Sequence, residues 1–178
     1  MFNLKYKFIN VIRSGSFGIV KLYKNRFTRK SFAVKQIKKL DFFPNEVKCL
    51  ENLKGVSGIQ QLNKVYESKT QVKLVFDYYP GMDLFDRVES GNLIEDKLSV
   101  HKLILSMAEC IKLCHGFGIS HNDIKMENFV FDKDGYLVLI DFGMSGFFGA
   151  DNCVRIGTSQ YAPPEFEYGV FYDTSDVD

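Results

Sequence analysis

The pattern of apolar residues changes near residue 80, and this change limits the chain to a strand-rich part followed by a helical part. Before that point, short runs rich in β-branched and aromatic residues are bounded by turn residues, which is typical of strands: 6–12, 19–23, 32–37 and 72–79. After it, residues 100–114 repeat their apolar positions at helical spacing and predict a helix with one buried face. We therefore expect an α+β fold.

The two parts form a single domain of two lobes, residues 1–79 and 80–178, with a hinge near residues 77–81. Pro44 precedes apolar residues at helical spacing, so one short helix is expected in the first lobe. Residues 129–140 predict a compact hairpin around the turn at 132–135. A cleft between two such lobes is where a ligand usually binds.

The charge of the whole chain is nearly balanced, with 23 basic and 22 acidic residues. This balance argues against a nucleic-acid scaffold and against a surface-charge membrane anchor, so neither partner is expected. The basic positions of the first lobe are interpreted as ordinary solvated surface: Arg26, Arg29, Lys30, Lys38 and Lys39.

The four cysteines, Cys49, Cys110, Cys114 and Cys153, show no zinc-finger spacing and have no secretory context. Cys110 and Cys114 lie four residues apart, so they are expected on one helix face as small apolar residues. Residues 1–7 lack the apolar segment of a signal peptide, and no run approaches the roughly 20 apolar residues of a membrane span. Reduced thiols in the cytoplasm or nucleus are expected.

A glycine-bearing turn, Gly15-Ser16-Phe17-Gly18, lies between the first two expected strands. Glycines let a backbone approach a polyphosphate closely, although an ordinary hairpin explains the same four residues. Lys35 on the next strand has the charge to neutralise phosphate oxygens, or it is simply solvated. Glu46, eleven residues later, is either its ion-pair partner or a surface carboxylate.

The segment 121–128, His-Asn-Asp-Ile-Lys-Met-Glu-Asn, is followed thirteen residues later by Asp141-Phe-Gly. Asn128 and Asp141 offer hard oxygen ligands of the kind that Mg²⁺ prefers alongside phosphate oxygens. Asp123 has the chemistry to orient and deprotonate an attacking hydroxyl, while Lys125 offsets charge on a transferred phosphoryl group. The spacing therefore indicates metal-assisted phosphoryl transfer.

These elements, in this order, resemble the catalytic domain of the eukaryotic protein kinases over essentially the whole chain. The resemblance also includes Gly157-Thr158 and the stretch from Tyr161 to Glu165. Lys125, two residues after Asp123, is similar to the serine/threonine class, and residues 81–87 are similar to calmodulin-dependent-type kinases. The resemblance implies a bilobal fold with a β-rich N-lobe and an incomplete helical C-lobe.

The resemblance also implies roles for individual residues, with ATP and Mg²⁺ as cofactors. The catalytic residues would be Asp123, Lys125, Asn128, Lys35 and Glu46, with Asn128 and Asp141 as metal ligands. The nucleotide would contact Ile12, Gly15, Ser16, Phe17, Gly18, Val20, Ala33, Lys35, Asp77, Tyr79, Asp83 and Val130, with Phe76 at the gatekeeper position. Leu50, Phe142 and His121 match members of the hydrophobic stack of an active kinase.

The chain departs from the family pattern at several positions. Arg13 replaces the first loop glycine, and Lys35 and Glu46 are closer in sequence than usual. Asn122 replaces the arginine that commonly binds a phosphorylated activation loop, so phosphorylation of Ser145, Thr158, Ser159 or Tyr161 is not expected to switch activity on.

The chain stops where the next helix of the family should begin. Asp176, which in the family ties down the catalytic loop, would lie on a fraying end, and Asp178 stands at the position of a tryptophan. The apolar face of residues 100–114 would be uncovered, or a second chain would cover it.

The favoured function is a protein serine/threonine kinase that transfers the γ-phosphoryl group of ATP to a substrate hydroxyl, with Asp123 as base. The alternative is a kinase-like module that binds nucleotide or a partner and turns over poorly, since a fold alone does not guarantee activity. A small-molecule kinase of related fold fits less well with the stretch from Tyr161 to Glu165.

Overall fold

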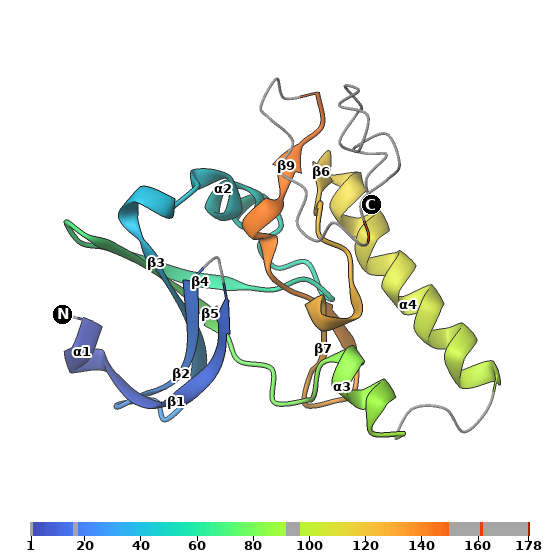
Figure 1. The fold of residues 1–178 in the computed structure, drawn as a ribbon, viewed down its shortest axis with the longest axis horizontal. Helices are drawn as coiled ribbons and strands as arrows, with labels where there is room; N and C mark the ends of the chain where they lie inside the picture. The colour runs from blue at the N-terminus through green and yellow to red at the C-terminus, as the bar shows by residue number, and fades with distance from the viewer. Residues whose placement is uncertain (1, 16–17, 92–96, 150–160, 162–177) are drawn as a thin grey trace. The chain divides into compact units, whose positions relative to one another are not determined.

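A computed structural model of the 178-residue chain describes residues 2–15, 18–91, 97–149, 161 and 178 (Figure 1). It divides into two compact units. The first comprises Met1–Pro44 and Gln61–Tyr78, and the second comprises Asn45–Gln60 and Tyr79–Asp178. The predicted α+β class is confirmed. Residues 45–60, which the sequence placed in the first lobe, group with the second unit. Among the described helices, none is both long and apolar enough to cross a membrane.

The first unit is built on one antiparallel sheet with the order β1-β2-β3-β5-β4. Its strands are β1 (Tyr6–Gly15), β2 (Gly18–Asn25), β3 (Ser31–Lys38), β4 (Leu62–Glu67) and β5 (Gln71–Asp77). The predicted strands are confirmed, whereas β4 was not predicted. A short 3₁₀ helix, Lys39–Asp41, follows β3.

An aromatic cluster closes one face of this sheet. Helix α1 (Phe2–Lys5) inserts Phe2 among the rings of Tyr6, Tyr23 and Tyr66, with centroids 4.9 to 5.2 Å apart. Buried aromatic side chains contribute large apolar areas, and tilted or edge-on pairs add to this gain. Burial raises the pKa of Tyr6 to about 12, with the Tyr66 hydroxyl adding to the shift, so Tyr6 stays neutral.

The described residues of the second unit form three α-helices and two two-stranded antiparallel sheets. The helices are α2 (Pro44–Asn52), α3 (Leu84–Glu89) and α4 (Lys97–Gly116). Strand β6 (Ile119–Ser120) pairs with β9 (Gly146–Phe147), and β7 (Phe129–Phe131) pairs with β8 (Leu137–Leu139). Short 3₁₀ helices, Met126–Asn128 and Phe142–Met144, precede β7 and β9. The start of α2 at Pro44 and the β7–β8 hairpin agree with the sequence prediction.

Residues 58–60, which follow α2 in the chain, form hydrogen bonds with β8, the strand that leads into Asp141. The backbone N–H of Leu139 donates to the Gly58 carbonyl at 2.9 Å, and the N–H of Gln60 donates to the Leu139 carbonyl at 2.9 Å. Ile59 bridges Leu139 in parallel, and both side chains are buried. These bonds satisfy the outer edge of β8 and hold it in place.

Gly81 precedes α3 at a position where the backbone must approach another strand. Its N–H donates to the Phe131 carbonyl at 3.0 Å, and a Cβ on Gly81 would collide with that carbonyl and with the Phe131 side chain. Glycine is therefore required for this contact. Asp83 then begins α3 by accepting the Asp86 N–H at 2.9 Å.

Helix α4 confirms the predicted helix and extends it at both ends. Cys110 and Cys114 are buried on one face, as expected, and both are free thiols. Burial raises the pKa of Cys114 to about 12, and the nearby Asp178 carboxylate acts in the same direction. Ile104 and Leu105 are 57% and 55% exposed, so part of the helix's apolar surface is uncovered among the described residues.

Candidate active site

The segment between β6 and β7 carries the side chains that the sequence singled out for chemistry. Asp123 is only 7% exposed. Its Oδ2 accepts a hydrogen bond from Lys125 Nζ at 2.7 Å and another from Asn128 Nδ2 at 3.0 Å. Asn128 also donates to the Asp123 carbonyl at 2.8 Å, which fixes the loop conformation around the carboxylate. The structure thus brings together three predicted catalytic residues.

This arrangement suits a carboxylate that orients a hydroxyl group and accepts its proton. Both donors fall on Oδ2, so the carboxylate is held in one rotamer and Oδ1 receives neither of them. Lys125 lies in a partly buried ion pair, where its charge is screened less than at a fully exposed site. The same ammonium group can stabilise negative charge that develops on a reacting phosphoryl group.

Asn128 and Asp141 are the residues whose oxygen atoms could hold a divalent metal. Ile140 N–H donates to the Asn128 carbonyl at 2.8 Å, so Asp141 follows directly after a residue bonded to Asn128. The Asn128 side chain donates both hydrogen bonds to Asp123 through its amide nitrogen, so its N–H groups point toward Asp123. One carboxylate and one amide oxygen fit Mg²⁺, which takes few protein ligands together with phosphate oxygens and water.

Asp141 has a left-handed backbone, with φ +63° and ψ +68°. Aspartate tolerates this region better than most residues, but the conformation still needs support from its surroundings. Gln60 supplies support, because its Oε1 accepts the Asp141 N–H at 3.0 Å. The buried Gln60 was not predicted, since it lies 81 residues away and belongs to no recognisable motif.

Asp178, far from Asp123 in the sequence, anchors the loop of residues 121–128 that contains Asp123. Its carboxylate is 0% exposed and accepts the backbone N–H groups of His121 at 2.6 Å and Asn122 at 2.7 Å. His115 Nε2 lies 3.2 Å from the same carboxylate. The family resemblance implied this role for Asp176, which lies outside the described residues, and Asp178 was noted only as standing at the position of a tryptophan. The structure assigns the anchoring bonds to Asp178.

His121, which precedes Asn122 and Asp123, is fully buried and contributes a neutral imidazole to the core of the second unit. Burial lowers its pKa, and its Nε2 donates to the Ile140 carbonyl at 2.9 Å, which requires the proton on that nitrogen. The ring packs edge-on against Phe142 at 4.8 Å, confirming one predicted contact of the hydrophobic stack. Leu50 is buried in the same unit.

Asn122 links the catalytic loop to the residues after Asp141. It has φ +63°, and its Nδ2 donates to the Met144 carbonyl at 3.0 Å. Asparagine populates the left-handed region more readily than arginine, which is the usual residue at this position in the protein kinases that the chain resembles. The β6–β9 pairing, Ser120 with Gly146, reinforces the same connection.

In the first unit, the predicted nucleotide-binding residues occupy adjacent strands of the sheet. Val20 pairs with Lys35 across β2 and β3, and Ala33 pairs with Phe76 across β3 and β5. Lys35 is buried. Gly18 has φ +122°, and a Cβ there would collide with the Gln36 carbonyl, so this turn requires glycine.

The remaining predicted positions have mixed outcomes. Ser16 and Phe17 lie outside the described residues. Asp77 forms an ion pair with Lys30 at 2.8 Å. Asp83 caps the N-terminus of α3 and forms an antiparallel backbone bridge with Val130 in the second unit. Glu46 is buried on α2, in a different unit from Lys35, so their pairing stays a prediction. Ile12 and Tyr79 lie on β1 and just after β5 respectively.

Comparison with known families identifies the family of this chain. The model of the protein kinase domain matches residues 6–178, so the chain belongs to the protein kinase domain family. This confirms the resemblance drawn from the motifs.

Among curated relatives, CBL-interacting serine/threonine-protein kinase 1 of Arabidopsis thaliana is 32% identical, over 95% of this chain and 40% of the relative. Calcium-dependent protein kinase 14 of Oryza sativa subsp. japonica is 33% identical, over 85% and 31%. Serine/threonine-protein kinase H1 homolog of Pinctada fucata is 34% identical, over 90% and 40%. The chain therefore matches at most 40% of the length of these three relatives.

Proposed function

We propose that this protein is a serine/threonine protein kinase, which transfers the γ-phosphoryl group of ATP to a serine or threonine hydroxyl of a protein substrate. The observation that carries the proposal is the buried Asp123 carboxylate, held by Lys125 and Asn128 in the unit that also contains Asp141. Curated relatives named as serine/threonine kinases support the same substrate class.

Each residue has a separate task in this reaction. Asp123 orients the substrate hydroxyl and accepts its proton as the oxygen attacks phosphorus. Lys125 offsets the negative charge on the transferred group. Asn128 and Asp141 would hold Mg²⁺, which supplies charge neutralisation at the phosphates. Most of the rate enhancement in such a site comes from positioning and electrostatics.

The first unit would bind the nucleotide. Lys35 is proposed to hold the α- and β-phosphates, and the turn ending at Gly18 to cover them with backbone N–H groups. Val20 and Ala33 would contact the adenine ring. The chain is proposed to act in the cytoplasm or nucleus, and a second chain is proposed to cover the exposed side of α4, where Ile104 and Leu105 are solvent-accessible.

A combined binding and turnover experiment tests this function. The full chain is titrated with a non-hydrolysable ATP analogue with and without Mg²⁺, and a melting-temperature increase that needs Mg²⁺ is expected. Phosphate transfer from ATP to a basic carrier protein is then measured for the wild type and for Lys35→Met. Transfer that is lost in the variant supports the kinase. Nucleotide binding without transfer would instead identify a binding module, and no binding by the folded chain would overturn both.

Phosphatase treatment is expected to leave turnover unchanged. The hydrogen bond from Asn122 to the Met144 carbonyl positions the residues directly after Asp141-Phe-Gly and needs no phosphate. Asn122 also provides no cation that could bind a phosphate. Ser145, one of the four candidate phosphorylation sites, is buried and donates its hydroxyl to the Phe142 carbonyl at 2.7 Å. Turnover is measured before and after phosphatase, with phosphate removal checked by mass spectrometry. A large loss of activity would show that a phosphate acts through some other cation.

A further inference from the structure

The two units carry opposite charges, although the whole chain is nearly neutral. The first unit contains 14 basic and 3 acidic residues, for a net charge of +11, and the second contains 9 basic and 19 acidic residues, for a net charge of −10. The basic positions that the sequence analysis interpreted as solvated surface are exposed, and the balance of charge over the whole chain does not extend to each unit. Whole-chain charge also no longer argues against an anionic partner, because a field acts locally over about a Debye length.

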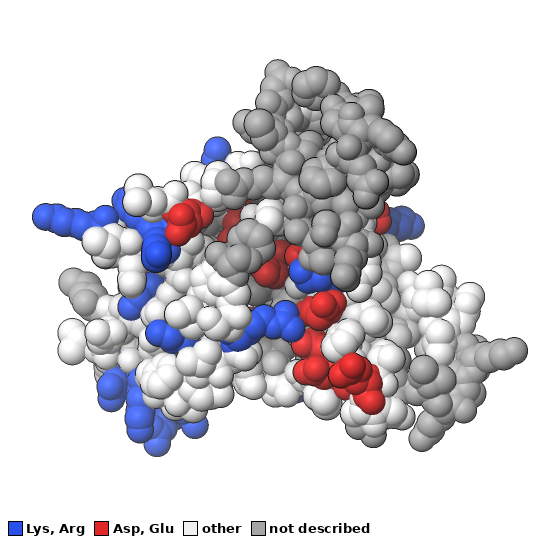
Figure 2. Space-filling model, in the orientation of Figure 1, with Lys and Arg blue, Asp and Glu red and all other residues white. Residues whose placement is uncertain are grey.

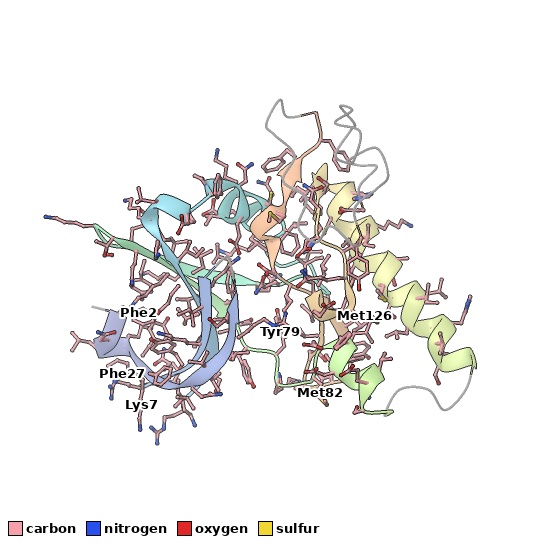
Figure 3. The ribbon with its side chains drawn as sticks, in the orientation of Figure 1. Phe2, Lys7, Phe27, Tyr79, Met82 and Met126 are labelled. Carbon is pink, nitrogen blue, oxygen red and sulfur yellow. The ribbon has the colours of Figure 1, made fainter. Side chains whose placement is uncertain are left out.

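Five of these cations gather at one end of the sheet, which we call the basic end: Lys5, Lys7, Lys24, Arg26 and Arg29. Lys7 lies directly opposite Lys24 in the β1–β2 register, and the Arg26 N–H donates to the Lys5 carbonyl at 2.9 Å. All five are exposed. Figure 2 shows Lys and Arg gathered at the lower left without visible acidic atoms among them, and Figure 3 places Lys7 there.

A rigid turn presents an aromatic side chain at the basic end. Asn25 Oδ1 accepts the N–H groups of Phe27 at 2.9 Å and Thr28 at 3.1 Å, and the Arg29 N–H donates to the Asn25 carbonyl. Phe27 is 78% exposed between Arg26 and Arg29 (Figure 3). Leu4, next to Lys5 on α1, is 74% exposed. Large apolar side chains thus emerge among the cations rather than in a separate patch.

The basic end is electrostatically costly for the isolated protein. Like charges directly opposite each other on neighbouring strands destabilise a sheet, as Lys7 and Lys24 do here. Two of the unit's three acidic residues are used elsewhere, Asp77 with Lys30 and Glu67 with Lys39. Within the described residues, none of the five cations of the basic end forms an ion pair with an acidic side chain. An anionic partner would relieve the repulsion.

The chemistry of the basic end favours an anionic lipid surface as that partner. Clustered Lys and Arg bind acidic headgroups through charge, and an exposed Phe and Leu add apolar area that enters the boundary between headgroups and acyl chains. A nucleic acid would use the cations and could stack on Phe27, but the aliphatic Leu4 offers it no stacking contact. The apolar side chains therefore decide between the two.

We infer that the basic end of the first unit docks this protein peripherally on membranes that contain anionic phospholipids. The docking is independent of the proposed phosphoryl transfer, because none of its residues belongs to the catalytic cluster.

Co-sedimentation of the full chain with vesicles tests the inference. Binding is expected to vesicles of phosphatidylserine in phosphatidylcholine and not to phosphatidylcholine alone. The double variant Lys7→Gln/Lys24→Gln is expected to lower the partition coefficient about 25-fold, from about fivefold for each cation. Phe27→Ser is expected to lower it roughly fivefold. The melting temperature of the double variant should equal or exceed that of the wild type, because the repulsion is removed.

The matched control is Lys38→Gln/Lys69→Gln, which removes the same charge at the other end of the sheet, where Lys38 pairs with Gln71. Lys38 lies seven residues beyond Ser31, which pairs with Lys24, so the two sites are roughly 23 Å apart along β3. The control is expected to retain vesicle binding, and so is a variant without turnover, Asp123→Asn. Equal losses in both double variants, or equal binding to neutral vesicles, would overturn the inference. Tighter binding to a fluorescent oligonucleotide, lost in Lys7→Gln/Lys24→Gln, would assign the basic end to nucleic acid instead.

Discussion

Replacing Asp123 with asparagine is expected to lower the turnover of phosphoryl transfer by about a thousandfold. The amide has nearly the same shape, but it cannot accept the proton of the substrate hydroxyl. It also offers one acceptor oxygen in place of two, while Lys125 and Asn128 both donate to Oδ2. Turnover is measured at saturating ATP and Mg²⁺, because nucleotide affinity should change little and the loss should fall on the chemical step.

Asp134→Asn is the matched control for Asp123→Asn. Asp134 is an exposed carboxylate in the turn of the β7–β8 hairpin, within the same unit, and it forms an ion pair with the neighbouring Lys133. Its variant should retain wild-type turnover and melting temperature, because an exposed pair contributes little. If Asp123→Asn kept more than about a tenth of the wild-type rate, general-base catalysis by this carboxylate would be excluded.

Replacing Asp178 with alanine is expected to lower the free energy of unfolding by about 4 kcal/mol, because two buried N–H donors lose their acceptor. These donors belong to His121 and Asn122, immediately before the catalytic carboxylate. Turnover should fall as well, since a misplaced Asp123 no longer meets the hydroxyl in the productive geometry. Chemical denaturation measures the stability, and hydrogen exchange at the amides of His121 and Asn122 reports the loop directly.

Two comparisons separate anchoring from a general loss of stability. Asp178→Asn keeps one acceptor oxygen and should lie between the wild type and Asp178→Ala in both stability and amide protection. Asp176→Ala tests the position that the family resemblance implied for this task. Fast exchange of the two amides in Asp176→Ala, with protection retained in Asp178→Ala, would reverse the assignment.

The sequence predicted the elements and residues whose pattern is local. Alternation of apolar residues located β1, β2, β3 and β5, and short motifs located Asp123, Asn128 and Asp141. The contacts of Gln60 and Asp178 join residues 81 and 57 positions apart, and each uses a single polar side chain. No period or spacing marks such a contact, because it depends on how distant segments fold together. Helix α1 was missed because four residues are too few to show helical periodicity.

The separation of charge was missed for a different reason, because charge was counted over the whole chain and not for each lobe. A net charge of +1 describes the whole chain, whereas the field felt by a partner depends on which residues share a unit. Residues 45–60 carry two acidic and two basic side chains, Glu46, Glu51, Lys48 and Lys54, so their grouping with the second unit leaves both net charges unchanged. The predicted lobe 1–79 already contains 16 basic and 5 acidic residues, and counting charge lobe by lobe would have shown the separation.

The bonds from residues 58–60 to the strand before Asp141 have a consequence for inhibitor resistance and design. Helix α2 and Asp141, the proposed metal ligand, belong to the same unit, where hydrogen bonds of Gly58, Gln60 and Leu139 link the segment after α2 to Asp141. A small molecule that displaced α2 would therefore strain the Asp141 backbone through these bonds without contacting residues 121–128 or 141–143. Substitutions at Gln60 would remove the hydrogen bond that transmits this strain, so selection for resistance to such a molecule is expected to yield changes at Gln60.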